Sequence, residues 1–149
     1  MQILRRLSSF NPPTSDMKQI YIAYIRSLLE QSSNVWHSSL TIQNENDLER
    51  VQKIACKLIL KEKYKTYEQA LKYLELDTLK QRRIDLSLTF ARKWVKTKKM
   101  KHLFPPNNGY HNMKTRNHEH FYVKHANTKR MQDSPIIYMQ NQLNDQLQR

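Results

Sequence analysis

Hydrophobic positions between residues 14 and 60 recur with helical spacing. In TSDMKQIYIAYIRSLLE, residues 14–30, apolar residues occupy most of the helix circumference. This pattern predicts a central helix enclosed by others, with Ser15 or Asp16 as its N-cap. On the narrow polar stripe that remains, Arg26 and Glu30 have the spacing of an ion pair. Residues 46–60, NDLERVQKIACKLIL, instead place their apolar residues on one face and predict an amphipathic helix.

Two further helices are predicted by capping patterns. The segments Thr66–Gln69 and Thr78–Gln81 each begin with a threonine and end with a glutamine three residues later, as in a capping box. The second opens a long helix that runs from residue 79 to about residue 99. Trp94 adjoins the apolar stripe of this helix, so packing in the core is favoured over stacking on nucleic-acid bases.

The composition changes after residue 103. Residues 103–112, LFPPNNGYHN, contain two prolines, the single glycine and three asparagines, which is typical of a loop or linker. Beyond them the chain is polar and rich in His, Asn and Gln. A short strand is predicted at residues 119–123, EHFYV. Ser134 as N-cap and Pro135 as the first helical residue predict a terminal helix.

These patterns together predict an all-α fold. We expect an N-terminal segment over residues 1–15 and a small helical bundle over residues 16–103. Residues 104–149 are expected to form a poorly ordered basic tail that contains the terminal helix and lets it dock back on the bundle.

The charge balance points to an anionic partner. The 149 residues include 26 Lys and Arg against 13 Asp and Glu, a formal net charge of +13. Such a charge repels itself, and nucleic acid is the commonest partner that relieves the repulsion, before lipid headgroups and acidic proteins. A membrane partner is disfavoured, since the basic residues are not backed by a broad exposed apolar face.

Cysteine usage and hydropathy bear on the compartment. The single cysteine, Cys56, forms no intramolecular disulfide and lies in a helical pattern, so we expect a buried, inert thiol and a reducing compartment. No apolar run approaches the ~20 residues of a membrane span, and residues 1–13 lack the apolar stretch of a signal peptide. The expectation is a soluble intracellular protein of the nucleus or cytoplasm.

Residues that would support catalysis or a cofactor are sparse. With Gly109 as the only glycine, no Gly-rich phosphate loop is present. The aspartates are scattered, without the carboxylate cluster that polymerases and nucleases use for metals. The acids of residues 45–49 are attributed to the positive end of a helix. A zinc site is disfavoured because the histidines lack nearby cysteines, and His37 with the serines after it lacks an orienting acid. We therefore predict no catalytic residue, metal or cofactor.

Basic residues on the long helix and just after it are the strongest functional signal. Lysine and arginine on a helix can line a phosphate backbone, and such binding weakens with salt because counterions are released. Phosphate contact is favoured over solvent-facing charge, since a surface that only maintains solubility mixes both signs. The predicted nucleic-acid-binding residues are Arg82, Arg83, Arg92, Lys93, Lys96, Lys98, Lys99 and Lys101.

Several segments, in order and at similar separations, resemble one protein family. They are IYIAYIRSLLEQSSNVWHSSLT, LERVQKIACKLIL, YKTYEQALKYLELDTLKQRR and FARK, within residues 20–93. They resemble the region after the palm in non-LTR retrotransposon reverse transcriptases of the jockey and CR1-like kind. Residues 1–19 resemble the thumb segment that enters this region, and MKTR and SPIIYMQNQLN resemble the far C-terminus of such proteins.

The resemblance implies a nucleic-acid-handling role. The family are RNA-directed DNA polymerases, in which the thumb grips the template-primer duplex and the following region holds RNA or target DNA. By position, Arg26, His37, Arg82 and Arg83 would lie on that module. We expect sequence-tolerant binding of RNA, DNA or an RNA–DNA hybrid.

The sequence departs from the family by lacking its catalytic parts. Neither the endonuclease domain nor the palm with its metal-binding box is present, and no Cys/His knuckle follows. The expectation is a C-terminal fragment with no enzymatic activity of its own, unless a palm domain joins it in trans. The alternative is a remnant that acts only as a protein-interaction or self-associating helical module.

Overall fold

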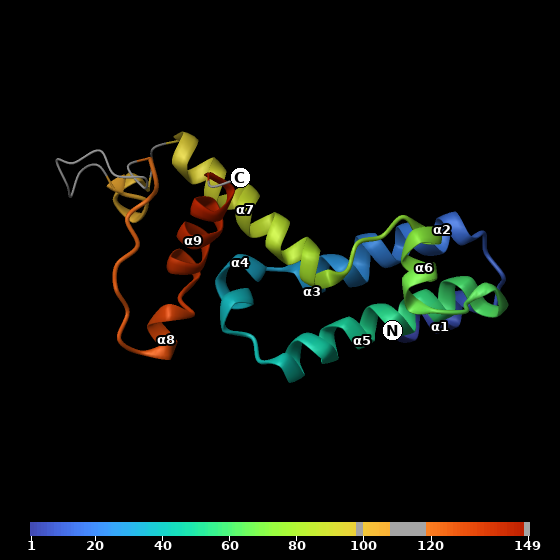
Figure 1. Cartoon of the computed structure of the whole chain (residues 1–149). Coiled ribbons are helices and arrows are strands. Elements are labelled where there is room, and N and C mark those ends of the chain that lie inside the picture. Colours follow the sequence, from blue (N-terminus) through green and yellow to red (C-terminus); the bar gives the residue numbers. More distant parts are fainter. Residues whose placement is uncertain (98–99, 108–118, 148–149) are drawn as a thin grey trace. The chain divides into compact units, whose positions relative to one another are not determined.

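The computed structural model describes residues 1–97, 100–107 and 119–147. Its regular elements in these ranges are all helical, which confirms the all-α prediction (Figure 1). The chain divides into two compact units. Unit 1 comprises residues 1–33 and 40–83, and unit 2 comprises residues 34–39 and 84–149. The predicted boundaries after residues 15 and 103 fall inside these units, and the division into an N-terminal segment, a helical bundle and a tail stays a prediction.

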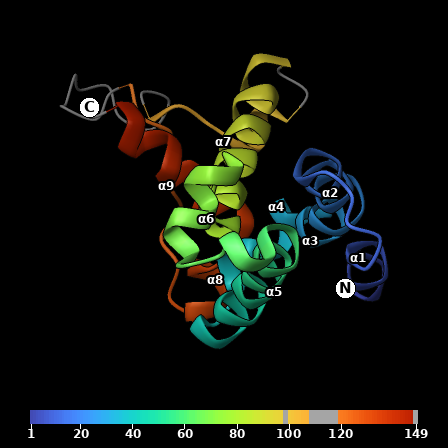
Figure 2. The same ribbon diagram turned by 90° about the vertical axis from the view of Figure 1, so that its right-hand side faces the viewer.

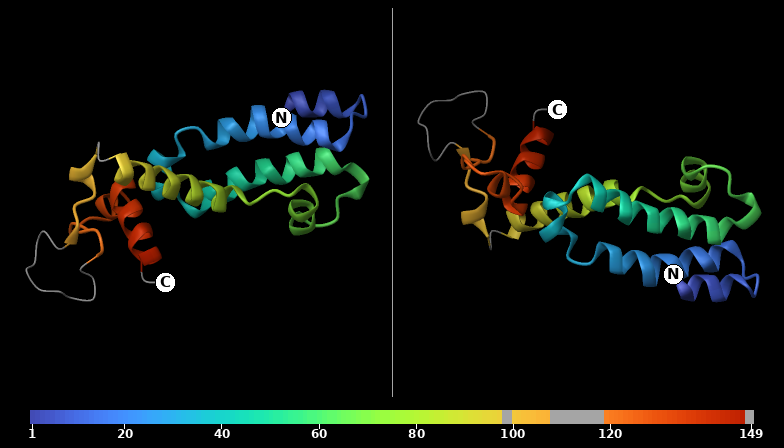
Figure 3. Two further views of the ribbon diagram at one scale, coloured as in Figure 1. Left: turned by 90° about the horizontal axis from the view of Figure 1, so that it is seen from above. Right: turned by 90° about the horizontal axis from the view of Figure 1, so that it is seen from below.

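Unit 1 is built around two antiparallel helical rods. One is formed by α2 and its continuations and the other by α5, and α1 packs against both α2 and α5 at one end (Figures 2 and 3). The elements are α1 (Gln2–Ser8), α2 (Thr14–Ile20), the π-helical η1 (Tyr21–Arg26), α3 (Ser27–Glu30), α5 (Ile42–Leu60), η3 (Lys61–Lys63), α6 (Tyr67–Leu74) and the first turns of α7 (Leu79–Thr97).

The core of unit 1 confirms the amphipathic pattern of α5. Ala55 and Ile59 face inward, four residues apart, and Cys56 is fully buried as predicted. Leu4 of α1 is also fully buried, so the N-terminal helix contributes to this core. The buried residues of the cluster are Leu4, Met17, Tyr21, Ala55, Cys56, Ile59, Leu60, Ala70, Leu74 and Leu76.

Unit 2 consists of the C-terminal turns of α7 and the elements that pack on them. Its core joins Leu88 and Ala91 of α7 to Met139 and Leu143 of α9, with Phe104 between. Figure 1 shows α9 crossing this part of α7. The other elements are the end of α4 (Ser33–Trp36), η2 (His37–Ser39), η4 (Lys101–Leu103), α8 (Lys129–Gln132) and α9 (Pro135–Leu147). The helix predicted at Pro135 is thereby confirmed.

Threonine side chains cap several helices. The Thr66 hydroxyl accepts from the Gln69 amide at 3.3 Å, and the Thr78 hydroxyl accepts from the Gln81 amide at 3.2 Å. Both predicted helix starts are therefore confirmed. Thr41 caps α5 in the same way, so this helix begins at Ile42, four residues before the predicted start.

The first long helix differs from its prediction in two respects. It begins at Thr14 after Pro13, whose extended backbone (φ −56°, ψ 146°) provides the N-cap, so the assignment of Ser15 or Asp16 as N-cap was wrong. The helix is also not enclosed on all sides, because Tyr24 is 64% and Leu28 71% exposed. Apolar residues around the whole helix favour burial, but the other elements of unit 1 pack against only one side of it.

The predicted strand at residues 119–123 was wrong. Phe121 makes a single isolated antiparallel bridge with Pro106. Its backbone N–H donates to Asn144 Oδ1 at 2.8 Å, and its carbonyl accepts from Asn144 Nδ2 at 3.0 Å. A side chain of α9 thus takes the backbone groups that a strand ladder would use. Across the described ranges, no helix has both the length and the hydrophobicity needed to cross a membrane.

Candidate nucleic-acid interface

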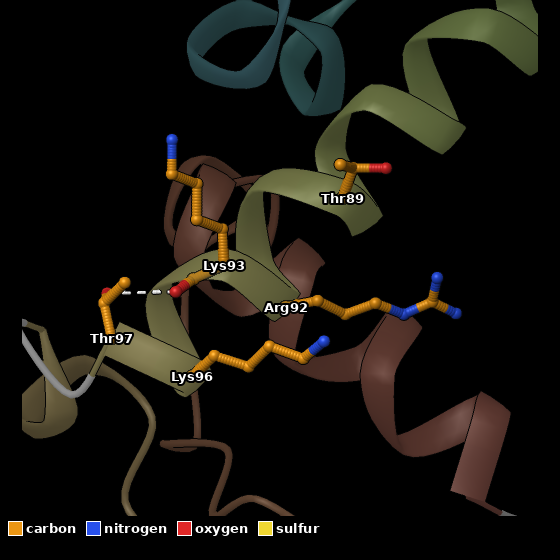
Figure 4. A pocket seen from close by; sticks show the side chains of 5 residues that line it. All are labelled: Thr89, Arg92, Lys93, Lys96 and Thr97. Carbon is orange, nitrogen blue, oxygen red and sulfur yellow. Dashed lines mark hydrogen bonds between the residues drawn. The ribbon is translucent and has the colours of Figure 1, made fainter.

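A basic depression lies on the C-terminal half of α7, within unit 2. Its volume is about 370 Å³ and the residues that line it are all exposed: Thr89, Arg92, Lys93, Lys96 and Thr97 (Figure 4). They recur at spacings of one, three and four residues, which brings side chains of a helix onto neighbouring rows of its surface. Among the residues that the structure describes, no carboxylate lines the depression, so its cations face solvent as a group of one sign.

The cations of the depression point in two directions. Figure 4 shows Arg92 and Lys96 extending to the same side of α7, whereas Lys93 extends to another. Arg92 and Lys96 are four residues apart, a rise of ~6 Å along the helix axis. The Arg92 Nη2 group also donates to Gln146 Oε1 of α9 at 2.7 Å, a contact that holds the guanidinium toward α9. Two cations on one row can contact separate phosphates of the same backbone.

Threonine hydroxyls flank the cations but are partly used by the helix itself. Thr97 Oγ1 donates to the Lys93 carbonyl at 2.9 Å, the contact drawn in Figure 4. This back-bond leaves the hydroxyl lone pairs directed outward. Thr89 and Thr97 were not predicted as site residues, although their spacing of four residues on either side of Lys93 was a signal in the sequence. Gln146 gave no such signal, because its role depends on how α9 packs.

The inner face of the same helix confirms the core interpretation of Trp94. The ring of Trp94 lies 4.4 Å from Phe90 and 6.3 Å from Phe104, measured between centroids. Phe104 in turn contacts Phe121 edge to face at 5.9 Å. Aromatic contacts of this kind rigidify α7 from behind while its basic row stays exposed. Trp94 therefore packs in the core of unit 2, as predicted.

The other predicted binding residues are distributed differently. Lys101 is exposed on η4 of unit 2, whereas Lys98 and Lys99 lie outside the described residues. Arg82 and Arg83 belong to unit 1 and do not line the depression. Arg83 is 1% exposed, so in this conformation its guanidinium does not reach solvent. All eight were predicted together because the sequence alone does not show which basic side chains the fold buries.

Arg82 has a partner inside unit 1. Its Nε and Nη2 donate to the two carboxylate oxygens of Glu30, at 3.0 and 3.1 Å. The predicted pair of Arg26 with Glu30 is also confirmed, with Nε 3.6 Å from Oε1. Glu30 thus contacts two of the arginines that the resemblance placed on the binding module, and its single negative charge offsets one of their two positive charges. His37, which the resemblance also placed on the binding module, is buried in unit 2. Its Nε2 lies 3.2 Å from the Tyr138 hydroxyl.

Titratable groups inside unit 1 are held protonated. Burial, followed by the negative charge of Glu49, raises the pKa of the Cys56 thiol to about 11. Burial and the hydrogen bond that Tyr67 donates to Glu49 raise the pKa of the Tyr67 phenol. A thiol in this state is a poor nucleophile. The described part of the chain brings no three His, Cys, Asp or Glu side chains together as a metal site.

Comparisons with known proteins gave no relative. No family model matches the chain, and no significant match was found among curated proteins or solved structures.

Proposed function

We propose that this chain binds nucleic acid, as the thumb and post-thumb region of a jockey- or CR1-like non-LTR reverse transcriptase. The observation that supports binding most is the exposed row of Arg92 and Lys96, with Lys93 beside it and no carboxylate in the depression. The family assignment rests on the resemblance of the segments within residues 20–93. The formal charge of +13 adds a long-range attraction for polyanions.

Binding by this surface would tolerate different sequences. Its cations contact phosphates, which position a duplex or strand but carry no base information. Trp94 faces the core, so base stacking on this helix is not part of the proposal. RNA, DNA and RNA–DNA hybrids all present such a backbone, and the proposed partners are all three.

A salt titration with a charge-reversed pair tests the proposal. Affinity for a labelled RNA–DNA hybrid is measured by fluorescence anisotropy at several salt concentrations, for the wild type and for Lys93→Glu/Lys96→Glu. Each lost phosphate contact lowers the log–log salt slope by ~1, so the double variant should lose about 2. The matched control, Lys65→Glu/Lys72→Glu, makes the same charge change at exposed positions of unit 1. Equal effects of the two pairs would show that only net charge matters.

We further propose that the chain does not polymerise DNA by itself. A polymerase holds its metal ions with clustered carboxylates, and the sequence lacks the palm motif that supplies them. Activity would require a palm domain in trans. In a primer-extension assay, the purified chain should give no product on its own, and extension by this preparation would contradict the proposal.

A second candidate function is self-association through an apolar face. Tyr24 and Leu28 are four residues apart on one row of unit 1 and are both more than half exposed, and Phe10 is 82% exposed. Exposed apolar neighbours such as Tyr24 and Leu28 favour contacts with another protein surface, and Phe10 adds a separate exposed apolar residue. Size-exclusion chromatography at low and high salt distinguishes the two functions, because an apolar oligomer persists in salt whereas nucleic-acid complexes dissociate.

A further inference from the structure

A second hollow of unit 2 has a mainly apolar lining and a lysine among its exposed residues. Its volume is about 300 Å³, near the low end of the ~300–1,000 Å³ typical of ligand sites. It is lined by residues of η4, of the segment 122–124 and of helices α8 and α9. We term its apolar lining residues the floor, which includes Leu103, Met131, Ile136 and Ile137, and its exposed polar residues, His102 and Lys124, the edges.

Hydrogen bonds between its walls keep this groove open in a defined shape. Gln140 of α9 donates from Nε2 to the Leu103 carbonyl at 2.7 Å. The Tyr122 amide donates to the Pro105 carbonyl at 2.8 Å, and Gln132 Nε2 of α8 donates to the Ala126 carbonyl at 3.1 Å. Each wall is thus tied to its neighbour by backbone or amide groups. A preformed groove spends little free energy on ordering when an occupant binds.

The charged groups around the groove are mostly cations. Lys124 lines it and is exposed, and Lys129 and Arg130 are exposed on α8 beside Met131. The nearest acid in sequence, Asp133, is partly buried. Among the described residues, no carboxylate lines the groove itself. An occupant with apolar groups for the floor and negative charge for the edges would complement it.

We infer that this groove binds a short acidic peptide segment of another protein, with one or two large apolar side chains inserted between α8 and η4. The apolar floor distinguishes it from the α7 depression, because a bare phosphate backbone would leave that floor in water. Met131 suits such a role, since a flexible thioether adapts to the shape of an inserted side chain. Its side chain is 38% exposed at the groove. The inference does not depend on the proposed function.

The test uses a peptide library, with substitutions that separate groove binding from general charge attraction. Random 12-residue peptides displayed on phage are selected on the full chain and counter-selected on Met131→Asp. Enriched peptides are then synthesised with a fluorophore, and their affinity is measured by anisotropy for the wild type, Lys124→Glu and Lys93→Glu. The two lysine variants carry the same charge change, and Lys93 lies in the α7 depression. Circular dichroism confirms that each variant keeps its helices.

The expected result is a set of peptides in which a large apolar residue is flanked by Asp or Glu. Lys124→Glu should weaken them at least about tenfold, because it places like charges together at the groove edge, while Lys93→Glu should change affinity less than about twofold. Absence of enrichment over the counter-selection, or equal loss in both lysine variants, would overturn the inference. The inference would also be overturned if a dT oligonucleotide displaced the peptide from the wild type and did not bind Lys124→Glu. The salt titration on Lys93 and Lys96 is unaffected by any of these outcomes.

Discussion

Arg82 donates two parallel hydrogen bonds to Glu30, from Nε to Oε1 and from Nη2 to Oε2, and the two residues are 52 positions apart in the sequence. The paired geometry fits the planar fork of a guanidinium to a carboxylate, and both side chains are largely withdrawn from solvent. This contact joins the start of α7 to the end of α3. Arg82 therefore has a structural partner in unit 1, and the phosphate contact that its charge and position predicted stays a prediction.

Replacing Arg82 should affect stability and not nucleic-acid binding. Arg82→Gln removes one half of a partly buried ion pair and should lower the free energy of unfolding by about 1–2 kcal/mol. Urea unfolding followed by circular dichroism measures the loss. The salt slope for the RNA–DNA hybrid should stay at the wild-type value, because no phosphate contact is removed. A salt slope lower by about 1, with an unchanged free energy of unfolding, would show that Arg82 contacts a phosphate.

Features with a local cause were predictable from the sequence. Thr66 and Thr78 cap helices through residues three positions away, and Pro135 opens α9 through its own fixed φ. The inward face of α5 follows from periodicity alone. The three cations of the α7 depression were among the eight basic residues named from the sequence, but the pattern of charge alone did not separate them from the other five.

Features that depend on distant partners were not predictable. The burial of Arg83 and the pairing of Arg82 require knowledge of what packs on the start of α7. The exposure of Tyr24 and Leu28 is the converse case, in which apolar residues meet no neighbour. Asn144 takes the backbone groups of Phe121 from 23 residues away, which cancels the predicted strand. In each case the deciding contact is tertiary, and a single sequence does not show it.

The buried polar chain from Tyr21 through Gln52 should be strongly coupled. The Tyr21 hydroxyl donates to Gln52 Oε1 at 2.7 Å, and Gln52 Nε2 donates to the Asp77 carbonyl at 2.8 Å. Gln52→Leu leaves the buried Tyr21 hydroxyl and the partly buried Asp77 carbonyl without these hydrogen bonds and should cost about 2 kcal/mol, and Tyr21→Phe about 1 kcal/mol. The double variant should cost little more than Gln52→Leu alone, since both changes remove the same contact. Additive losses in urea unfolding would show that the two side chains act independently.

Cys56 should resist thiol reagents in the folded chain. Its side chain is fully buried, and its raised pKa leaves almost no thiolate near neutral pH. Labelling with an aromatic disulfide reagent at about pH 8 should be slow for the native chain and fast in concentrated guanidinium chloride. Rapid labelling without denaturant would mean that the core of unit 1 opens readily.

Unit 1 should lose stability at alkaline pH. Burial raises the pKa of Cys56 from 9.0 to about 11, and it raises the pKa values of Tyr21 and Tyr67 in the same direction. The folded chain therefore keeps protons that the unfolded chain releases, so this contribution is complete below about pH 9 and falls as pH rises through 11. Urea unfolding at pH 8 and pH 10.5 measures the fall. Cys56→Ala should show a smaller fall, and that comparison cancels the titration of surface lysines. An equal fall in the variant would assign the effect to other groups.

Trp94 should support the nucleic-acid interface without touching the ligand. Its ring packs on Phe90 and Phe104, so Trp94→Phe removes aromatic contacts worth about 1 kcal/mol or more while leaving the basic row in place. Affinity for the RNA–DNA hybrid and its salt slope should stay within about twofold of the wild type in Trp94→Phe and also in Trp94→Leu, which has no ring, whereas loss of base stacking would cost ~1–3 kcal/mol per base. Anisotropy titrations of the three proteins, with matched circular dichroism spectra, distinguish the two roles. A tenfold loss of affinity in a folded Trp94→Leu variant would mean that the indole leaves the aromatic cluster to stack on bases, and the packing role of Trp94 would have to be abandoned.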